Sequence, residues 1–242
     1  MVLQGKKNLK LSIIIPTYNE SATICEIISY VNAVQYPIEH ELIIVDDASS
    51  DRTYEKEMIL RSKEKHKNLK LFRNQINRGK GASVRTGIQH ASGDIMIIQD
   101  ADTEYAPKDI PRLIQPILNG EADAVFGSRF MNCRWPEGMA FPNWIGNKIL
   151  TALTNLLFGL SLTDEATCYK AIRTKLVRKM HLRTNRFAID PEINAKLAKM
   201  GARIIELPIA YQARSAKQGK KIKAKDLIYA VITLLYNRFA KI

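Results

Sequence analysis

Short apolar runs alternate with longer stretches of helical character through the first half of the chain. The runs are rich in Ile, Val and Leu, and they occupy residues 11–15, 41–45, 69–72, 95–98 and 122–126. Runs of this length and composition predict buried strands. The stretches between them predict helices at residues 20–34, 52–65, 82–91 and 107–119. This β-α-β-α order predicts an α/β protein with a parallel sheet covered by helices.

Polar clusters follow three of these apolar runs. Asp46 and Asp47 come after the second run, residues 77–81 after the third, and residues 100–102 after the fourth. The carboxyl ends of parallel strands share one edge of the sheet, and ligands bind in the crevice there. We therefore expect these clusters to meet in one site.

The second half of the chain has a different pattern. We expect a loop at residues 128–142, helices at 143–158 and 192–200, a strand at 203–207, and a mostly apolar final helix at 227–239. The helix at 143–158 is amphipathic, with Asn147, Thr151 and Asn155 on its polar face. The amino-acid composition of the chain is that of a globular protein. The 242 residues contain no internal repeat and no obvious linker, so we expect one domain.

Positive charge is concentrated in the second half. The net charge is +13, yet residues 1–120 hold 16 basic and 15 acidic residues, whereas residues 121–242 hold 21 and 9. Such an excess indicates a polyanionic partner, which is nucleic acid, a membrane surface or a phosphorylated substrate.

Cysteine usage and hydropathy indicate the compartment. Cys25, Cys133 and Cys168 are widely spaced and form no CxxC pair, which is typical of a reducing environment. The polar first ten residues do not resemble a signal peptide, and no stretch approaches the roughly 20 apolar residues that span a bilayer. We expect a cytoplasmic protein.

Three carboxylates alternate in the segment Asp100-Ala101-Asp102-Thr103-Glu104. Directly after a buried strand, Asp100, Asp102 and Glu104 are candidate ligands of a hard divalent cation, Mg²⁺ or Mn²⁺, and Ala101 lies between them at the same site. Such an ion bridges a diphosphate and neutralises a departing nucleotide. The alternative is a solvated acidic turn before the next helix.

Lys80 lies in a glycine-rich segment that leads into a predicted helix, where an anion would bind. The segment satisfies neither common phosphate motif. A Walker loop needs Gly where this chain has Asn74, and the dinucleotide fingerprint needs Gly where it has Val84. ATPase and dehydrogenase activities are therefore disfavoured. Asp46 and Asp47 add acceptors at the same edge, although residues 50–51 also suit a helix N-cap.

Taken in order, these segments resemble the family-2 glycosyltransferases, and among them the polyprenyl-phosphate sugar transferases similar to dolichol-phosphate mannose synthase. The resemblance covers roughly residues 10–225. It rests on residues 16–20, 45–51, 78–81 and 100–102, and it continues through 127–129, 163–164, 167–173, Arg214 and 219–221.

The resemblance implies a GT-A type, Rossmann-like fold: a mostly parallel sheet flanked by helices, with a C-terminal amphipathic helical extension. Within one domain, residues 1–127 would bind the nucleotide sugar, and residues 128–242 would bind the acceptor and include the final helix. It also implies metal-dependent transfer with inversion at the anomeric carbon. The donor would be a GDP- or UDP-hexose.

The resemblance and the chemistry of the residues together give the expected site. Asp102 and Arg129 belong to the expected catalytic set, and the resemblance implies that Arg129 meets the acceptor phosphate. Glu192 completes this set as a candidate base. Asp100, Asp102 and Glu104 would hold the metal, although mannose synthases usually have Gln at the position of Glu104. The expected donor-binding residues are Pro16, Tyr18, Glu20, Asp46, Asp47, Lys80, Asp100, Ala101, Arg214, Lys220 and Lys221.

Two acceptors remain open at this stage. A polyprenyl phosphate, dolichyl or undecaprenyl, is already anionic and needs positioning more than a base, which arginines supply. A glycan hydroxyl needs a carboxylate base, for which Asp164, Asp190 and Glu192 are candidates. A basic nucleic-acid-binding module is a remote alternative, because the basic run lacks interleaved aromatic residues.

A lipid acceptor implies contact with an anionic membrane surface. Trp135, Phe141 and Trp144 suit a headgroup boundary, and residues 211–225 hold six basic and no acidic side chains. The alternatives are that the helix at 143–158 packs on the sheet and that the basic run is a solvated loop. The final helix is too short to span, so attachment to the cytoplasmic face would be peripheral or through a membrane-spanning partner.

Overall fold

One mixed sheet organises the protein. The computed structural model describes residues 9–63, 67–213 and 224–240. The strand order is β3-β2-β1-β4-β6-β5-β7, and β6 runs antiparallel to both of its neighbours whereas the other pairs are parallel. The strands are β1 (Lys10–Thr17), β2 (Glu39–Asp46), β3 (Leu69–Arg73), β4 (Ile95–Ile98), β5 (Ala124–Ser128), β6 (Lys170–Arg173) and β7 (Ile204–Pro208). The predicted α/β class is confirmed.

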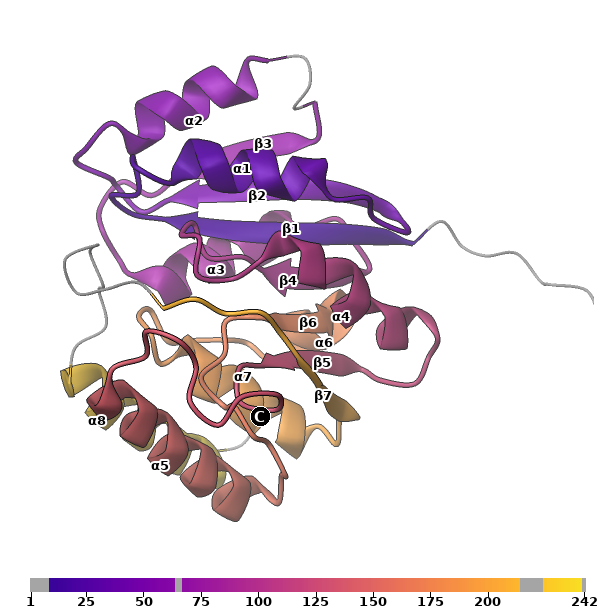
Figure 1. Ribbon diagram of the computed structural model, residues 1–242, viewed down its shortest axis with the longest axis vertical. Helices are drawn as coiled ribbons and strands as arrows, with labels where there is room; N and C mark the ends of the chain where they lie inside the picture. Colours follow the sequence, from indigo (N-terminus) through magenta and orange to yellow (C-terminus); the bar gives the residue numbers. More distant parts are fainter. Residues whose placement is uncertain (1–8, 64–66, 214–223, 241–242) are drawn as a thin grey trace, which may run out of the picture.

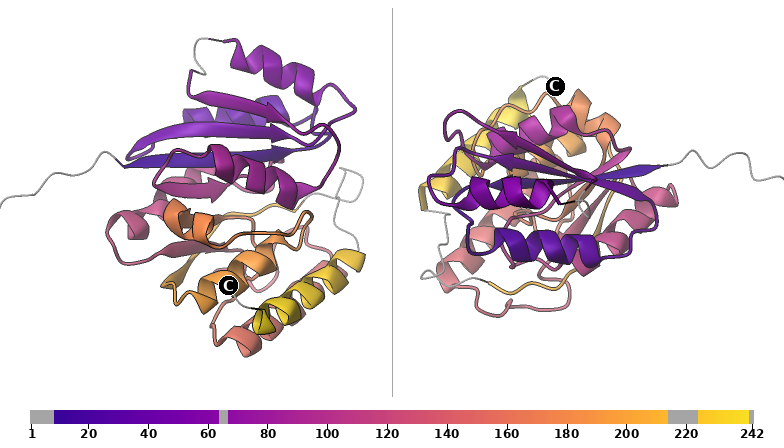
Figure 2. Two further views of the ribbon diagram at one scale, coloured as in Figure 1. Left: turned by 180° about the vertical axis from the view of Figure 1, so that it is seen from behind. Right: turned by 90° about the horizontal axis from the view of Figure 1, so that it is seen from above.

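Helices cover both faces of this sheet (Figures 1 and 2). They are α1 (Ile24–Ala33), α2 (Thr53–Arg61), α3 (Lys80–His90), α4 (Ile110–Leu118), α5 (Phe141–Phe158), α6 (Thr174–Lys179), α7 (Ile189–Lys199) and α8 (Ala224–Phe239), with a short 3₁₀ turn, η2 (Pro107–Asp109), before α4. Because both faces are covered, the central strands are apolar throughout: Ile13, Ile14 and Ile15 of β1 are fully buried.

Two elements were not predicted, namely β6 and the short helix α6. Only Ala171 and Ile172 are apolar in β6, and they lie between Lys170 and Arg173. The strand nevertheless pairs with both β4 and β5, and Lys170 is fully buried. A hydropathy pattern does not show a strand whose longest buried side chain is charged.

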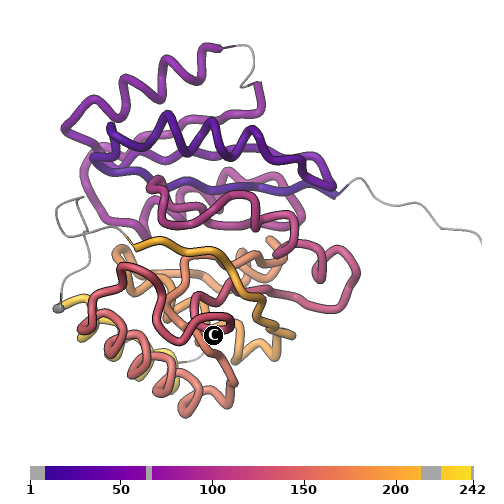
Figure 3. Tube along the Cα trace, in the orientation of Figure 1, coloured from indigo at the N-terminus to yellow at the C-terminus, as the bar shows by residue number. Residues whose placement is uncertain are grey.

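The helices α5 and α8 lie side by side at the end of the molecule remote from α1 and α2 (Figure 1). They pack on each other through Leu150, Ala230 and Leu234. The tube in Figure 3 shows that the indigo and purple part of the chain occupies the opposite end. The two halves of the sequence therefore build the two ends of one sheet.

The polar face of α5 points into the protein, while its apolar side chains are divided between the contact with α8 and the outer surface. Thr151 and Thr154 are buried, whereas Leu156 is 82% exposed and Ile149 is 52% exposed. Packing of this apolar face on the sheet, one of the two alternatives, is therefore not what the structure has. No helix within residues 9–63, 67–213 and 224–240 has the length and hydropathy needed to cross a bilayer.

Glu57 of α2 is a buried carboxyl group near the end of β2. It is 0% exposed. Burial raises the pKa of Glu57 to about 8 from an ordinary value of 4.5, and the Asp46 carboxylate raises it as well. Because the pKa is higher in the folded state, the stabilisation is complete below pH 4.5 and is lost as the pH rises toward 8.

Replacing Glu57 by Gln imitates the neutral carboxyl and removes its titration. We expect the free energy of unfolding of Glu57→Gln to rise relative to wild type between pH 5 and pH 8, by at most about 1.4 kcal/mol per pH unit. Urea unfolding across this range measures the difference. Glu55→Gln on the same helix is the control, because Glu55 is exposed and pairs with Arg52. Identical pH profiles for the two variants would contradict the burial of a neutral Glu57.

Candidate active site at the carboxyl ends of the strands

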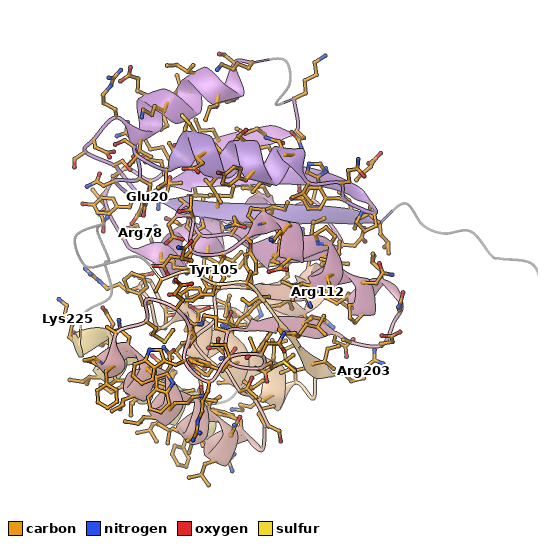
Figure 4. All side chains as sticks on the ribbon, viewed as in Figure 1. Glu20, Arg78, Tyr105, Arg112, Arg203 and Lys225 are labelled. Carbon is orange, nitrogen blue, oxygen red and sulfur yellow. The ribbon has the colours of Figure 1, made fainter. Side chains whose placement is uncertain are left out.

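A cleft of about 850 Å³ opens at the carboxyl ends of β1, β2 and β4 and continues between α5, α7 and α8. Figure 4 shows Glu20, Arg78 and Tyr105 on this side of the molecule, away from Arg112 and Arg203. The structure brings together ten of the residues expected at the site, all of which line the cleft: Pro16, Tyr18, Glu20, Asp47, Lys80, Asp100, Ala101, Asp102, Glu104 and Arg129.

The loops that follow β1 and β2 brace each other at the rim of the cleft. Asn19 is in the left-handed region, with φ of 49°, which Asn tolerates better than most residues. Its backbone N–H donates to Ser49 Oγ at 3.0 Å, and its side-chain oxygen accepts from Ser50 N at 2.9 Å. These bonds fix the positions of Tyr18 and Glu20 on either side of Asn19.

Asp47 organises the glycine-rich segment before α3. Its carboxylate accepts from Gly79 N at 2.6 Å, Arg78 N at 3.1 Å and Asn74 Nδ2 at 2.7 Å. Gly79 has φ of +95°, and a Cβ there would lie 2.6 Å from the carbonyl oxygen of Asn185. Only glycine fits this position, and the turn directs Lys80 into the cleft.

Lys80 and Asp100 form an ion pair at the centre of the cleft. Nζ of Lys80 lies 2.7 Å from Oδ1 of Asp100, and their side chains are 13% and 22% exposed. Burial alone would lower the pKa of Lys80, but the Asp100 carboxylate raises it well above its ordinary value. The lysine is therefore a fixed positive charge beside the acidic segment.

The three predicted metal ligands do not converge. Asp102 Oδ1 accepts from Glu104 N at 3.0 Å, and Glu104 Oε2 accepts from the Tyr211 hydroxyl at 2.8 Å. Within the described part of the chain, no three Asp, Glu, His or Cys side chains are arranged to hold a metal ion. Asp100 and Asp102 still fit a cation that takes one or two carboxylates together with phosphate oxygens and water, as Mg²⁺ does.

Arg129 is held by a second buried ion pair. Its Nε and Nη2 each lie 2.7 Å from an oxygen of Asp164, and its backbone N–H donates to the same carboxylate at 3.0 Å. Nη2 also donates to Asn147 of α5 at 3.2 Å. Burial alone would lower the pKa of Arg129, but the Asp164 carboxylate raises it well above the ordinary value. A permanent cation therefore lines the cleft beside α5.

Lys170 and Asp190 form a third buried pair, and it was not predicted. Lys170 Nζ donates to Asp190 Oδ1 and to the carbonyl oxygen of Glu165, each at 3.0 Å, and also to the carbonyl oxygen of Thr167. Asp190 lines the cleft, where it was expected only as one of three alternative bases. The sequence signal for this pair is weak, because Lys170 and Arg173 enclose only two apolar residues, Ala171 and Ile172.

Glu192, expected in the catalytic set, is not among the residues that line the cleft. Its carboxylate accepts from the backbone N–H groups of Arg183 and Thr184 at 2.9 and 2.8 Å, and it pairs with Lys196 at 2.6 Å. Burial alone would raise the pKa of Glu192, but these hydrogen bonds lower it. The structure gives Glu192 a role in anchoring the segment before α7.

Asp46 was also expected at the donor site, but it does not line the cleft. Asp46 is fully buried, accepts from Ser49 N at 3.1 Å and pairs with Arg73 at 3.1 Å, so it supports the loop and does not line the cleft. Arg214, Lys220 and Lys221 lie outside the described residues.

An apolar arm of the cleft was missed altogether. The cleft extends away from the charged pairs between α5, α7 and α8. The apolar side chains that line this arm are Met139, Pro142, Leu150, Phe187, Pro191, Leu227 and Ala230. They come from three separate segments, so no local pattern in the sequence connects them.

The protein is a GT-A-like α/β protein. Its sheet is mostly parallel, two carboxylates follow β4, and a glycine-rich segment after β3 leads into α3. The chain belongs to glycosyl transferase family 2, because the model of that family, described as "Glycosyl transferase family 2", matches residues 12–180.

The chain is also similar to named proteins of archaea. It is 31% identical to a dolichol-phosphate mannosyltransferase of Pyrococcus furiosus over 90% of this chain, and it spans 61% of that protein's length. It is 30% identical to a UDP-N-acetylglucosamine–dolichyl-phosphate N-acetylglucosaminyltransferase of Methanococcus voltae, over 92% of this chain and 94% of the other.

A solved structure shares the fold. Glucosyl-3-phosphoglycerate synthase of Mycobacterium tuberculosis, in complex with Mn²⁺, UDP and glucosyl-3-phosphoglycerate, superposes with a TM-score of 0.68. The match covers 95% of this chain and 80% of that one at 19% sequence identity, so it shows the fold alone.

The Arg129–Asp164 pair should be a major contributor to the stability of the site. Asp164→Asn removes the charge that compensates a buried guanidinium, so we expect a loss on the order of 3 kcal/mol in the free energy of unfolding, measured with urea. Asp123→Asn is the control, since Asp123 is 24% exposed and pairs with the exposed Arg203. We expect less than about 1 kcal/mol there. Equal losses would show that Arg129 is compensated in another way.

Proposed function

We propose that the protein is an inverting, divalent-metal-dependent glycosyltransferase that moves a hexose from a GDP- or UDP-hexose to a polyprenyl phosphate. The observation that carries this proposal is the composition of the cleft, in which a charged end adjoins an apolar arm. A nucleotide sugar suits the charged end, and a prenyl chain suits the arm. Relatives named for dolichyl-phosphate and undecaprenyl-phosphate acceptors support the same substrate class.

The charged end suits the donor. Tyr18, Glu20 and Asp47 surround the place for the nucleoside, and Lys80 supplies a fixed positive charge for the diphosphate. A divalent cation held by Asp100 and Asp102 would neutralise the charge that develops on the leaving nucleoside diphosphate. The Mn²⁺ and UDP in the M. tuberculosis enzyme of the same fold support this assignment.

The acceptor side needs positioning more than proton transfer. A polyprenyl phosphate is an anionic nucleophile, so a buried and permanently charged Arg129 would hold it in line with the anomeric carbon. The nucleophile attacks the anomeric carbon from the side opposite the leaving group, which inverts the configuration there.

Asp190 favours the second candidate, transfer to a glycan hydroxyl, because it lines the cleft and could accept the proton of a hydroxyl group.

A radiolabel transfer screen separates these two acceptors. Several GDP- and UDP-hexoses are offered with polyprenyl phosphate or free glycans, with metal or with EDTA. We expect label in the organic phase only with lipid phosphate and metal. Label transferred to free glycans, without lipid product, would establish the second candidate instead.

Asp102→Asn should reduce transfer at least about 100-fold without unfolding the protein, because it removes one of the two carboxylates that fit the cation. Asp94→Asn is the matched control, since Asp94 precedes the same strand at the opposite edge of the sheet and its side chain accepts from Lys10 N. Wild-type turnover in the Asp102 variant would contradict the assignment.

Peripheral contact with an anionic membrane is part of this proposal. The outward faces of α5 and α8 expose Ile149, Leu156, Ile232 and Phe239, at 52%, 82%, 54% and 84%. The sequence of α5 contains no acidic residue, and the acidic residue of α8, Asp226, is 9% exposed. Apolar side chains without exposed carboxylates suit the boundary of an anionic bilayer. The apolar arm lies between the same helices, so a lipid acceptor would reach it from the cytoplasmic face.

Vesicle binding tests this contact. We expect the double variant Ile232→Glu, Phe239→Glu to bind vesicles of 30% phosphatidylglycerol about tenfold or more weakly than wild type, because it replaces apolar burial by charge repulsion. Co-sedimentation measures the affinity. Met58→Glu is the control, since Met58 is 49% exposed on α2 at the other end of the molecule. Equal binding of both variants would exclude α8 from the contact.

A further inference from the structure

Arg186 is a cation of the cleft that the buried ion pairs do not involve. Within the described residues, the basic side chains that line the cleft are Lys80, Arg129 and Arg186. Lys80 is paired with Asp100, and Arg129 is paired with a second buried carboxylate. By contrast, no ion pair or hydrogen bond joins the guanidinium group of Arg186 to a residue that the structure describes. Its charge is therefore available to an anionic ligand.

The segment that carries Arg186, residues 183–186, is braced between two helices. Glu192 of α7 accepts from the first two backbone N–H groups of the segment, at 2.9 and 2.8 Å. On the other side, the carbonyl oxygen of Asn185 accepts from Ala82 N of α3 at 3.0 Å. Hydrogen bonds to both helices therefore fix the backbone from which the Arg186 side chain extends.

The aliphatic stem of Arg186 lies against the glycine turn before α3. A Cβ atom at Gly79 would lie 2.9 Å from Cγ of Arg186, and a Cβ atom at Gly81 would lie 2.9 Å from its carbonyl oxygen. Two missing side chains thus allow this close approach. Lys80 lies between the two glycines, and Gly79 N donates to Asp47, which lines the cleft at the expected place of the nucleoside. Arg186 therefore belongs to the donor end of the cleft.

We propose that Arg186 is a donor-binding residue whose guanidinium group binds the diphosphate of the nucleotide sugar. This inference rests on the proposed function, because it requires a nucleotide-sugar donor. Among the described residues that line the cleft, carboxylates outnumber cations, and the charge of Lys80 is already compensated by Asp100. An anionic diphosphate therefore needs a further positive charge there. A guanidinium group supplies the charge together with two parallel N–H donors that match the oxygens of a phosphate.

Titration calorimetry with UDP and with GDP, each in the presence of Mg²⁺, tests this assignment. We expect Arg186→Gln to raise the Kd of the nucleotide that wild type binds about tenfold or more, because charge-assisted hydrogen bonds to the diphosphate are lost. The Gln side chain keeps most of the stem that packs against Gly79. Arg186→Lys should recover part of the lost affinity, since it retains the charge but not the two parallel donors.

Arg183→Gln is the matched control. Arg183 is an exposed arginine of the same segment, but its guanidinium group donates to the Tyr236 hydroxyl and does not line the cleft. The control removes the same charge, so we expect its Kd for the nucleotide to stay within about twofold of wild type, because solvent screens an exposed charge. The unfolding midpoint of Arg186→Gln without nucleotide should equal that of wild type, since no described residue loses a bond to the guanidinium group.

Three results would overturn the inference. Equal nucleotide affinities of Arg186→Gln and Arg183→Gln would exclude Arg186 from the donor site, and a raised KM for polyprenyl phosphate alone would then assign it to the acceptor phosphate. A lowered unfolding midpoint of Arg186→Gln together with weaker binding would make the role of Arg186 structural. A wild type that binds neither UDP nor GDP would overturn the proposed function and this inference with it, whereas a wild type and an Arg186→Gln variant that bind equally well would overturn the inference alone.

Discussion

The site depends on the requirement that a buried charge be compensated. A lysine or arginine taken out of water costs several kcal/mol unless a carboxylate and further hydrogen bonds meet it. Three cations meet this requirement around the cleft: Lys80 with Asp100, Arg129 with Asp164, and Lys170 with Asp190. Each pair joins segments distant in the sequence, so satisfying the charges also brings α3, β4, β6 and α7 to one place. The contacts that compensate the buried charges are therefore also the contacts that assemble the site.

The same requirement explains why α5 is oriented with its polar face inward. Asn147 accepts from Arg129, Thr151 Oγ1 accepts from Glu165 N, and Asn155 forms two hydrogen bonds with the backbone of Leu162. These polar side chains direct one face of the helix inward, because their hydrogen-bonding partners lie within the protein. Leu150 is buried against α8, whereas Ile149 and Leu156 remain exposed. The polar contacts of α5 and its packing on α8 therefore leave apolar side chains on the outer surface of the helix.

A sequence pattern predicts a feature of this protein where its cause is local and does not predict it where the partner is distant. The apolar strands and the polar clusters at their ends were predicted, because burial on both faces and the shared edge of a parallel sheet require them. The strand β6 was missed because Lys170 is compensated by Asp190, which lies 20 residues away. The sequence does not show that Asp190 and not Glu192 lines the cleft, because this depends on where α7 begins. Positions two apart on a helix point in directions about 200° apart. The hydrogen bond between Tyr211 and Glu104 joins residues 107 positions apart, so no local pattern shows it.

The buried ion pairs show which of the excess positive charges are compensated inside the protein and which face the solvent. Arg129, Lys170 and Lys196 lie in the basic half of the chain, but each is compensated by a carboxylate and contributes little to the field outside the molecule. Among the described residues, Arg134, Lys225 and Arg238 are exposed on or near the two helices whose outer faces are apolar. A nucleic acid would gain from the charge but would leave that apolar surface in water. An anionic lipid surface would use both features, because headgroups would meet the cations while acyl chains covered the apolar side chains. The position of the charge therefore favours lipid over nucleic acid as the polyanion.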